Sequence, residues 1–241
     1  MTNNSTKSRA GYLKKFTTLG LDVQAEEIFS SSFAAAGYLK QQGFPEDKKV
    51  YIIGEVGIVE ELDLAGIKHV GGPEDAGKKV ELKPGEMLVQ DPDVAAVVVG
   101  FDREINYHKI QMATLCIREN KAEFIGTNPD AVTHLTAEQE WAGNGSMVGA
   151  IKGSTNQEPT IVGKPSQFML DYMAKEYGIS KSEICMVGDR LDTDIEFGNA
   201  GGAKTLLVLS GVTTEGTLLS PDNSIKPDFY ASSMPELTKL A

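Results

Sequence analysis

Three short apolar segments in the last third of the chain, separated by two helical stretches, constrain the fold more than any other feature. The apolar segments are residues 160–162, 184–187 and 205–209, and the helical pattern covers residues 167–177 and 194–200. A succession of strand, helix, strand, helix and strand gives a parallel unit with right-handed crossovers. The sequence therefore predicts an α/β fold whose core is a doubly wound, Rossmann-like parallel sheet.

The first two thirds of the chain show the same alternation after a helical beginning. Residues 5–43 predict two helices, the first with Tyr12, Phe16 and Leu19 on one side. After this beginning, strands are predicted at residues 50–53, 94–99 and 123–125, and helices at residues 59–64 and 109–119. The unbroken apolar run 94–99 is typical of a parallel strand that is buried on both faces.

A change of composition indicates two domains. Residues 143–153 are rich in glycine and residues 153–159 are polar, as a crossing between domains would be. We therefore expect a core formed by residues 1–43 and 158–241, with an inserted α/β cap domain formed by residues 44–157.

The composition favours small-molecule partners over nucleic acid or membrane. The 241 residues carry a formal net charge of −11, which opposes binding to nucleic acid or to an anionic membrane surface. No apolar run approaches the roughly 20 residues of a membrane span. The two cysteines, Cys116 and Cys185, are predicted to be buried thiols of a reducing compartment. An anionic substrate would need a local positive field, which Lys164 and Arg190 could supply.

A run of hydroxyl and amide side chains stands at the beginning of the sequence. Thr2, Asn3, Asn4 and Ser5 have the composition of a phosphate-binding turn at the end of a strand. A hydroxyl followed by successive amides forms a concave anion-binding nest. The same residues could instead cap a helix that begins near Lys7, and the two interpretations are compatible.

A lysine and two aspartates follow the predicted strands of the last third. Lys164 lies between Gly163 and Pro165, where its charge would hold a phosphoryl oxygen, although a lone surface lysine is usually solvated. Asp189 and Asp194 flank the loop between a strand and a helix. Either these aspartates solvate a turn and cap the helix, or Asp189 binds Mg²⁺ while Asp194 orients the loop without touching the metal. Because the carboxyl ends of parallel strands share one edge, the polar groups are expected to converge there.

The order of the motifs Thr-Asn-Asn-Ser, Gly-Lys-Pro and Gly-Asp-Arg-Leu-Asp-Thr-Asp resembles the haloacid dehalogenase superfamily of Mg²⁺-dependent phosphatases with a large inserted cap. Residues 2–9, 33–39, 97–102, 130–135 and 188–195 look like the plant-type phosphoglycolate phosphatases within it, and the resemblance covers essentially the whole chain. It implies an enzyme that hydrolyses small phosphate monoesters. The expected reaction is the Mg²⁺-dependent conversion of 2-phosphoglycolate to glycolate and phosphate.

The resemblance also implies roles for individual residues. Thr2 and the amides of Asn3 and Asn4 are expected to bind the phosphoryl group. Lys164 is expected to stabilise the nucleophile and the transferred charge, so that Thr2 and Lys164 are the catalytic residues within the chain. Asp189 is expected to complete the Mg²⁺ site.

The inserted domain is expected to act as a lid that excludes water and contacts the part of the substrate beyond the phosphate. We expect the turn 127–130 of this domain to reach the active site, because it combines a constrained backbone with the polar side chains of Asn128 and Asp130. An ordinary solvent-facing turn is the alternative.

The superfamily uses the first aspartate of an Asp-x-Asp-Gly motif as its nucleophile, and this motif does not occur in the chain. Asp91-Pro92-Asp93 has the spacing, but it lies in the expected insert without a strand before it. We therefore expect the nucleophile several tens of residues before Thr2. In that case the chain as written lacks the first core strand, is poorly stable alone and does not turn over substrate.

Other functions stay open at this point. One alternative is a pyridoxal-phosphate or nucleotide phosphatase, and another is a non-catalytic, truncated form that binds phosphate or Mg²⁺ and pairs with a complete partner. The resemblance implies a soluble protein of the chloroplast stroma with a role in photorespiration, whose targeting segment is not part of the sequence, and the cytoplasm is the alternative location. It leaves homodimer formation open.

Overall fold

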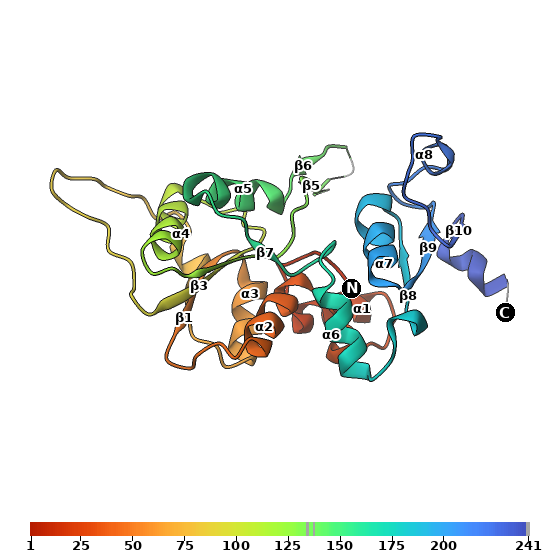
Figure 1. Cartoon of the computed structure of the whole chain (residues 1–241), viewed down its shortest axis with the longest axis horizontal. Helices are drawn as coiled ribbons and strands as arrows, with labels where there is room; N and C mark the ends of the chain where they lie inside the picture. Colours follow the sequence, from red (N-terminus) through yellow and green to blue (C-terminus); the bar gives the residue numbers. More distant parts are fainter. Residues whose placement is uncertain (134, 137, 240–241) are drawn as a thin grey trace. The chain divides into compact units, whose positions relative to one another are not determined.

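The computed structural model describes residues 1–133, 135–136 and 138–239, and it divides the chain into two compact units, Met1–Gly163 and Lys164–Ala241 (Figure 1). Each unit is an α/β arrangement with a parallel sheet at its centre. None of the helices in the described part of the chain combines the length and the apolar character that crossing a membrane requires.

A five-stranded parallel sheet in the order β2-β1-β3-β4-β7 forms the centre of the first unit. The strands are β1 (Lys49–Ile53), β2 (His69–Gly71), β3 (Val94–Val99), β4 (Glu123–Gly126) and β7 (Thr160–Ile161). From β1 the chain winds first to β2 and then crosses to β3 on the other side, so the winding reverses between β1 and β3. Ligand crevices of open α/β sheets lie at such a reversal, outside the carboxyl ends of the strands.

Helices cover both faces of this sheet, with α2 and α3 on one face and α4 and α5 on the other (Figure 1). The helices of the unit are α1 (Arg9–Thr18), α2 (Ser31–Gln41), α3 (Val56–Leu64), α4 (Tyr107–Arg118) and α5 (Asn144–Thr155). A short antiparallel pair, β5 (Val132–Thr133) with β6 (Trp141–Ala142), precedes α5. The buried cluster that joins the sheet to α4 and α5 includes Val97, Val99, Ile117, Phe124 and Ile151. Because β3 is covered on both faces, its sequence is apolar throughout.

The second unit is built on a three-stranded parallel sheet in the order β10-β9-β8. Its elements are α6 (Phe168–Tyr177), β8 (Cys185–Gly188), a π-helical turn (Leu191–Ile195), α7 (Glu196–Gly201), β9 (Lys204–Val208), α8 (Glu215–Leu219) and β10 (Phe229–Ala231). Leu191, Ile195, Leu207 and Leu218 form a buried cluster. Burial of Leu191 and Ile195 therefore anchors the turn that follows β8.

Most predicted strands and helices lie near their expected positions, but the partner of one strand was predicted wrongly. The expected strand 160–162 is β7, which pairs with β4 of the first unit and not with β8. Gly126 permits this pairing, because a Cβ atom at that position would lie 2.8 Å from Ile161 Cδ1. The three strands of the last third therefore do not form one continuous sheet.

Two further differences concern the glycine-rich passage and the cysteines. The sequence predicts no helix in residues 143–153, yet they form most of α5, since Met147 and Ile151 bury one side of it in the core. Cys116 is buried as predicted, and burial raises the pKa of its thiol to about 12. Cys185 is exposed, contrary to prediction, because it begins β8 at the edge of the second sheet.

The segment that begins the chain packs on the carboxyl ends of β1 and β3. Gly57 N donates to Thr6 O at 3.2 Å, and Phe101 N donates to Ser5 Oγ at 3.0 Å. A Cβ atom at position 57 would lie 2.5 Å from the backbone N and C atoms of Lys7. Glycine is thus required by the close approach of two backbones, and this contact holds the segment where the winding of the sheet reverses.

Residues 1–43 therefore belong to the same compact unit as the five-stranded sheet. The assignment of residues 1–43 and 158–241 to a core and of residues 44–157 to an inserted cap concerns how the fold is assembled from domains. It stays a prediction.

We expect Gly57→Ala to lower the free energy of unfolding of the chain by about 1–3 kcal/mol, the usual cost of adding a methyl group where packing is tight. Gly149→Ala is the matched control, because a Cβ atom there, inside α5, meets no atom within 4 Å. Alanine should even stabilise that helix by roughly 0.5–1 kcal/mol. Urea unfolding followed by circular dichroism measures both variants, and equal stabilities would contradict the close packing of Lys7 on α3.

Candidate functional site

A pocket of about 430 Å³ lies in the first unit, at the carboxyl ends of β3 and β4. Segments distant in the sequence form its wall: the beginning of the chain, the residues after β3, and the turn after β4 with the beginning of α5. The lining residues are Thr2, Asn3, Asn4, Ser5, Thr6, Lys7, Phe101, Arg103, Asn128, Asp130, Thr133, Leu135, Gly143 and Asn144. Most of them carry amide, hydroxyl or charged groups, so the pocket suits a polar ligand.

Hydrogen bonds fold the beginning of the chain into a compact turn. Thr2 N donates to Phe29 O at 2.8 Å, and Thr2 O accepts from Ser31 N at 3.0 Å, next to the beginning of α2. Thr2 Oγ1 accepts from Asn4 N at 3.2 Å, and Asn4 Oδ1 accepts from Thr6 N at 2.8 Å. Such side-chain to backbone bonds are typical of Asx and Ser/Thr turns. They fix the hydroxyl and amide groups that line the pocket.

The alternative function of this segment as a helix cap is wrong. Helix α1 begins at Arg9, and its cap is Ser8, whose Oγ accepts from Gly11 N at 3.1 Å. Residues 2–5 lie before this cap, so their conformation is not explained by the start of the helix. Their contacts are with α2, with the strand ends and with the pocket.

The turn after β4 reaches the same pocket. Asn3 Nδ2 lies 3.3 Å from both carboxylate oxygens of Asp130. Asn128 is only 4% exposed, and its Oδ1 accepts from Thr127 Oγ1 at 2.9 Å and from Asn144 Nδ2 at 3.3 Å. Asn128 is therefore buried, unlike the side chain of an ordinary solvent-facing turn. The structure brings together Thr2, Asn3, Asn4, Asn128 and Asp130.

In the second unit, the ammonium group of Lys164 donates a hydrogen bond to the Asp194 carboxylate. Both residues are buried. Asp194 Oδ2 accepts from the backbone N of Asp189 at 3.2 Å and from that of Arg190 at 3.3 Å. A cation and two amide donors thus compensate the buried carboxylate, and Asp194 ties the loop after β8 to Lys164. The role of Asp194 as a residue that orients the loop around a bound metal stays a prediction.

Asp189 follows β8 and is held by the chain after β9. Its Oδ2 accepts from Val212 N at 2.9 Å, and its backbone O accepts from Thr213 N at 3.0 Å. A side chain at Gly211 would collide with the Asp189 carboxylate. No described residue donates a hydrogen bond to Oδ1 of Asp189, which therefore retains the oxygen ligand that Mg²⁺ prefers.

The remaining donors for a metal ion would have to be water or other oxygen atoms. Across residues 1–133, 135–136 and 138–239, no group of three or more His, Cys, Asp or Glu side chains is arranged to hold a metal. Mg²⁺ is commonly bound by one or two carboxylates and keeps several waters. The carboxylate of Asp189 therefore fits a magnesium ion, although it is only part of a coordination shell.

Arg190 does not supply the free positive charge that the sequence suggested. Its Nη2 lies 2.7 Å from Asp192 Oδ2, and its Nε donates to Asp192 Oδ1 at 3.0 Å. This hydrogen-bonded guanidinium lowers the pKa of the Asp192 carboxyl. The charge of Arg190 is thus largely offset within its own loop.

The pair Asp91 and Asp93, which has the spacing of the nucleophile motif, lies away from the pocket. Asp91 Oδ2 is 2.7 Å from Lys49 Nζ, and Asp93 Oδ1 is 3.4 Å from Lys48 Nζ. Both aspartates come directly before β3 and so lie at the amino end of the sheet, whereas the pocket lies at the carboxyl ends. Their ion pairs with neighbouring lysines explain them without a catalytic role.

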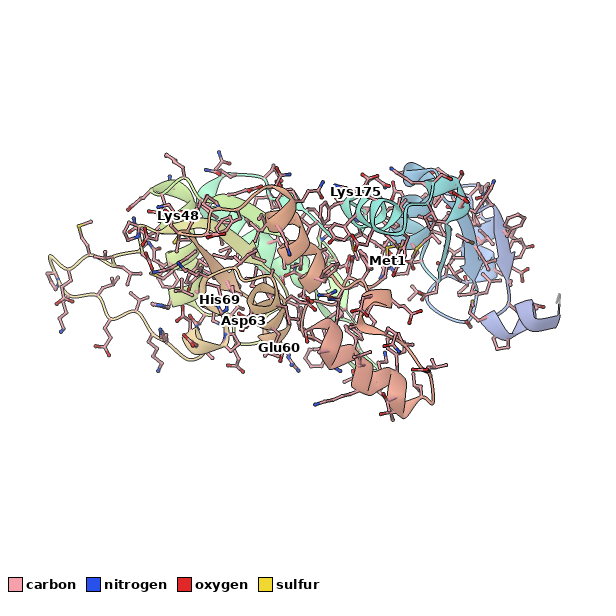
Figure 2. All side chains as sticks on the ribbon, turned by 90° about the horizontal axis from the view of Figure 1, so that it is seen from below. Met1, Lys48, Glu60, Asp63, His69 and Lys175 are labelled. Carbon is pink, nitrogen blue, oxygen red and sulfur yellow. The ribbon has the colours of Figure 1, made fainter. Side chains whose placement is uncertain are left out.

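Both described histidines contact carboxylates outside the pocket. His69 Nε2 lies 2.9 Å from Asp63 Oδ1, and Figure 2 shows the two residues side by side. His108 Nε2 lies 3.6 Å from Asp75 Oδ2. His134 lies outside the described residues. The histidines therefore offer no support for metal binding or for a Ser-His-Asp arrangement at this site.

Sequence reasoning missed Lys7 and Asn144, which the structure adds to the lining of the pocket. Asn144 Nδ2 donates to Asn128 O at 2.7 Å and to Thr127 Oγ1 at 3.1 Å. No periodic pattern connects the turn with the first residue of α5, because the contact depends on how β5 and β6 return the chain. Only the three-dimensional arrangement could identify Asn144.

Comparison with known families agrees with this fold. A family model described as haloacid dehalogenase-like hydrolase matches residues 1–68, and one described as HAD-hydrolase-like matches residues 161–237. The chain therefore belongs to the haloacid dehalogenase-like hydrolase family. The two matches contain Thr2, Asn3, Asn4, Lys164 and the loop aspartates Asp189 and Asp194, whereas Asn128 and Asp130 lie between them.

Individual relatives are phosphatases. The chain is 66% identical over 235 residues to phosphoglycolate phosphatase 1A, chloroplastic, of Arabidopsis thaliana, covering 97% of the chain and 65% of that relative. A p-nitrophenyl phosphatase from Archaeoglobus fulgidus has a similar structure, with a TM-score of 0.82 and 32% identity over 99% of the chain and 84% of its own. A glycerol phosphate phosphatase from Mycobacterium tuberculosis in complex with magnesium also has a similar structure, with a TM-score of 0.80 and 27% identity. The match covers 98% of the chain and 65% of that phosphatase.

Replacing Asp194 by asparagine should destabilise the second unit. Asp194→Asn removes the carboxylate that faces the buried Lys164 ammonium, a change that costs about 3–5 kcal/mol in a buried pair. Asp192→Asn in the same loop is the control, because the exposed pair with Arg190 contributes less than about 1 kcal/mol. Urea unfolding of both variants gives the comparison. If Asp192→Asn lowered the free energy of unfolding more than Asp194→Asn does, the Lys164–Asp194 contact would not be what stabilises the loop.

Proposed function

We propose that the chain provides the greater part of a phosphatase that hydrolyses small phosphate monoesters, with 2-phosphoglycolate as the substrate and glycolate and phosphate as products. The observation that carries the proposal is the pocket in which the Thr2–Asn4 turn lies beside Asn128 and Asp130. The 66% identity to a phosphoglycolate phosphatase supports the choice of substrate. The chain spans about two thirds (65%) of the length of that relative, so the activity of the whole protein is part of the proposal.

In this function the Thr2 hydroxyl and the amides of Asn3 and Asn4 hold the phosphoryl group. Hydrogen-bond donors aimed at developing charge are the largest single contribution to many such reactions. Lys164 is a buried cation, and a phosphoryl oxygen would compete with Asp194 for its ammonium protons. Thr2 and Lys164 are therefore the proposed catalytic residues of the chain. Asn128 and Asp130 contact the part of the ester beyond the phosphate.

The nucleophile is proposed to be an aspartate outside the 241 residues, because Asp-x-Asp-Gly occurs nowhere in them. That aspartate would attack phosphorus to form an aspartyl-phosphate, which water then hydrolyses. The second aspartate of the motif would protonate the leaving alkoxide and then activate the water. Residues 69–160 lie between the two family matches, which supports an inserted cap within residues 44–157.

Mg²⁺ is the proposed metal, with Asp189 as its ligand in the chain and Asp194 as the residue that orients the loop. The magnesium complex of a similar phosphatase supports this choice. The ion would neutralise part of the negative charge of the phosphoryl group.

Removing the Asp189 carboxylate should weaken magnesium binding. We expect Asp189→Asn to reduce the Mg²⁺ affinity of the purified chain at least 10-fold, because a neutral amide replaces the charged oxygen ligand. Asp192→Asn is the control, since Asp192 is paired with Arg190 in the same loop. Isothermal titration calorimetry with MgCl₂ measures both variants. An unchanged affinity in Asp189→Asn would overturn the assignment of the metal ligand.

The substrate assignment is tested by turnover. The protein purified from its source should have its highest kcat/KM for 2-phosphoglycolate among a panel with pyridoxal phosphate, a nucleoside monophosphate and p-nitrophenyl phosphate. Lys164→Ala in that protein should lower kcat by about 10²–10³, the range for loss of one group that stabilises transition-state charge. Lys175→Ala is the control, because Lys175 is exposed on α6.

The same assay with the 241-residue chain alone tests where the nucleophile lies. No turnover is expected, since the nucleophile would be absent. Turnover near the rate of the source protein would contradict the placement of the nucleophile, and a higher kcat/KM for another ester would contradict the substrate. Phosphate binding without turnover in both proteins would favour a binding function.

The chloroplast stroma is the proposed location, supported by the chloroplastic relative, and the cytoplasm is the alternative. Immunoblotting of purified plastids against the remaining cell fraction would decide between them. Enrichment of the protein outside the plastids would exclude the stroma.

A further inference from the structure

The side chain of Asn128 is a buried polar group of the pocket. It is 4% exposed, and its Oδ1 already accepts two hydrogen bonds, from Thr127 Oγ1 and from Asn144 Nδ2. No described residue accepts a hydrogen bond from Asn128 Nδ2. Both donors favour the orientation in which the amide oxygen faces them, so the NH₂ group is left as a donor in a residue that lines the pocket.

Asn144 fixes Asn128 and is itself fixed. Its Nδ2 lies 2.7 Å from the backbone oxygen of Asn128, so a reversed amide would place two oxygens in contact. Asn144 is 2% exposed, and its Oδ1 is buried without a partner in the described part of the chain. A buried polar atom without a hydrogen bond destabilises the folded state. The arrangement therefore costs free energy in order to hold the turn in one orientation.

The backbone of α5 reinforces the same turn. Gly145 N donates to Asp130 O at 2.8 Å, and Gly143 N donates to Ala131 O at 2.8 Å. A Cβ atom at position 145 would lie 2.6 Å from Pro129 O. The turn at Asn128 is thus hydrogen-bonded to the amino end of α5. The partial positive charge of this helix end favours an anion nearby.

The charged groups of the pocket allow an anion at Asn128. Lys7 contributes a positive charge. Arg103 is bidentate with Glu55, with Nε–Oε1 and Nη2–Oε2 distances of 2.7 and 2.8 Å. The Asp130 carboxylate keeps its negative charge while it accepts hydrogen bonds from the neutral amide of Asn3. Fixed donors at Asn128 and a cation at Lys7 therefore remain for an anionic ligand.

We infer that Asn128 Nδ2 binds the carboxylate of the alcohol portion of the substrate, with Asn144 as the residue that positions Asn128 and with Lys7 contributing charge. The inference rests on the proposed phosphatase function, since the phosphoryl group occupies the Thr2–Asn4 turn. It assigns specificity for short phosphate monoesters that carry a carboxylate. A neutral alcohol portion lacks the acceptor charge that these donors select.

The test uses binding of product and analogue to the whole ¹⁵N-labelled chain, so it does not depend on turnover. Glycolate should shift the Asn128 side-chain NH₂ signals saturably, and ethylene glycol, which replaces the carboxylate by a hydroxymethyl group, should not. The Asn128 signals are identified by their loss in Asn128→Asp. Inorganic phosphate is titrated separately and should shift the backbone amides of Asn3 and Asn4.

Two variants separate positioning from folding. Asn144→Asp removes the donor to Asn128, and it should weaken glycolate binding at least 10-fold while the response of Asn3 and Asn4 to phosphate is retained. Lys7→Gln should weaken glycolate binding about 3- to 10-fold and reduce its dependence on salt concentration. A merely structural role of Asn144 would instead weaken the responses to glycolate and to phosphate together.

The outcomes separate this inference from the proposed function. If phosphate shifts Asn3 and Asn4 while glycolate leaves Asn128 unmoved, the carboxylate site is overturned and the phosphatase proposal stands. If ethylene glycol shifts Asn128 as strongly as glycolate, the group recognised is a hydroxyl and the inference is overturned. If glycolate shifts Asn128 but phosphate has no effect, the carboxylate site stands and the phosphate site of the proposed function is overturned.

Discussion

The close contact between the beginning of the chain and the ends of β1 and β3 is the constraint on which the first unit depends. Gly57 and Gly100 have no side chains to separate the segment from the sheet, and Ser5 bonds the backbone after β3. The Thr2–Asn4 turn is therefore attached to the same sheet whose strand β4 leads into the turn at Asn128. A pocket wall assembled from distant segments then has defined geometry, because each segment is fixed to the sheet.

The charge of the chain and the chemistry of its pocket are opposite in character. A chain with a formal net charge of −11 repels anions at long range. The pocket lining includes the amides of Asn3, Asn4 and Asn128 and the cation of Lys7, which would offset this repulsion locally in the proposed function. Neutral donors suit this purpose because they provide oriented dipoles without placing several like charges side by side.

Sequence reasoning predicted the secondary structure and the candidate residues better than it predicted which strands and side chains contact each other. The apolar run of β3 could be predicted because burial on both faces determines its composition. The motifs at Thr2, Lys164 and Asp189 could be found because their residue types and their order along the chain resemble those of a known family. The pairing of β7 with β4 depends on which sheet edge is available, and no local pattern records that. The contact of Asn3 with Asp130, 127 residues apart, likewise exists only through the fold.

The Asp194 carboxylate serves two purposes at once, since one oxygen faces Lys164 and the other the backbone amides of Asp189 and Arg190. An anion that draws the Lys164 ammonium away leaves Asp194 with more negative charge to share with the loop that carries Asp189. If the proposed anion binds Lys164 and the proposed Mg²⁺ binds Asp189, the two occupancies would be thermodynamically linked through a single side chain. By reciprocity, each ligand changes the affinity of the other by the same factor.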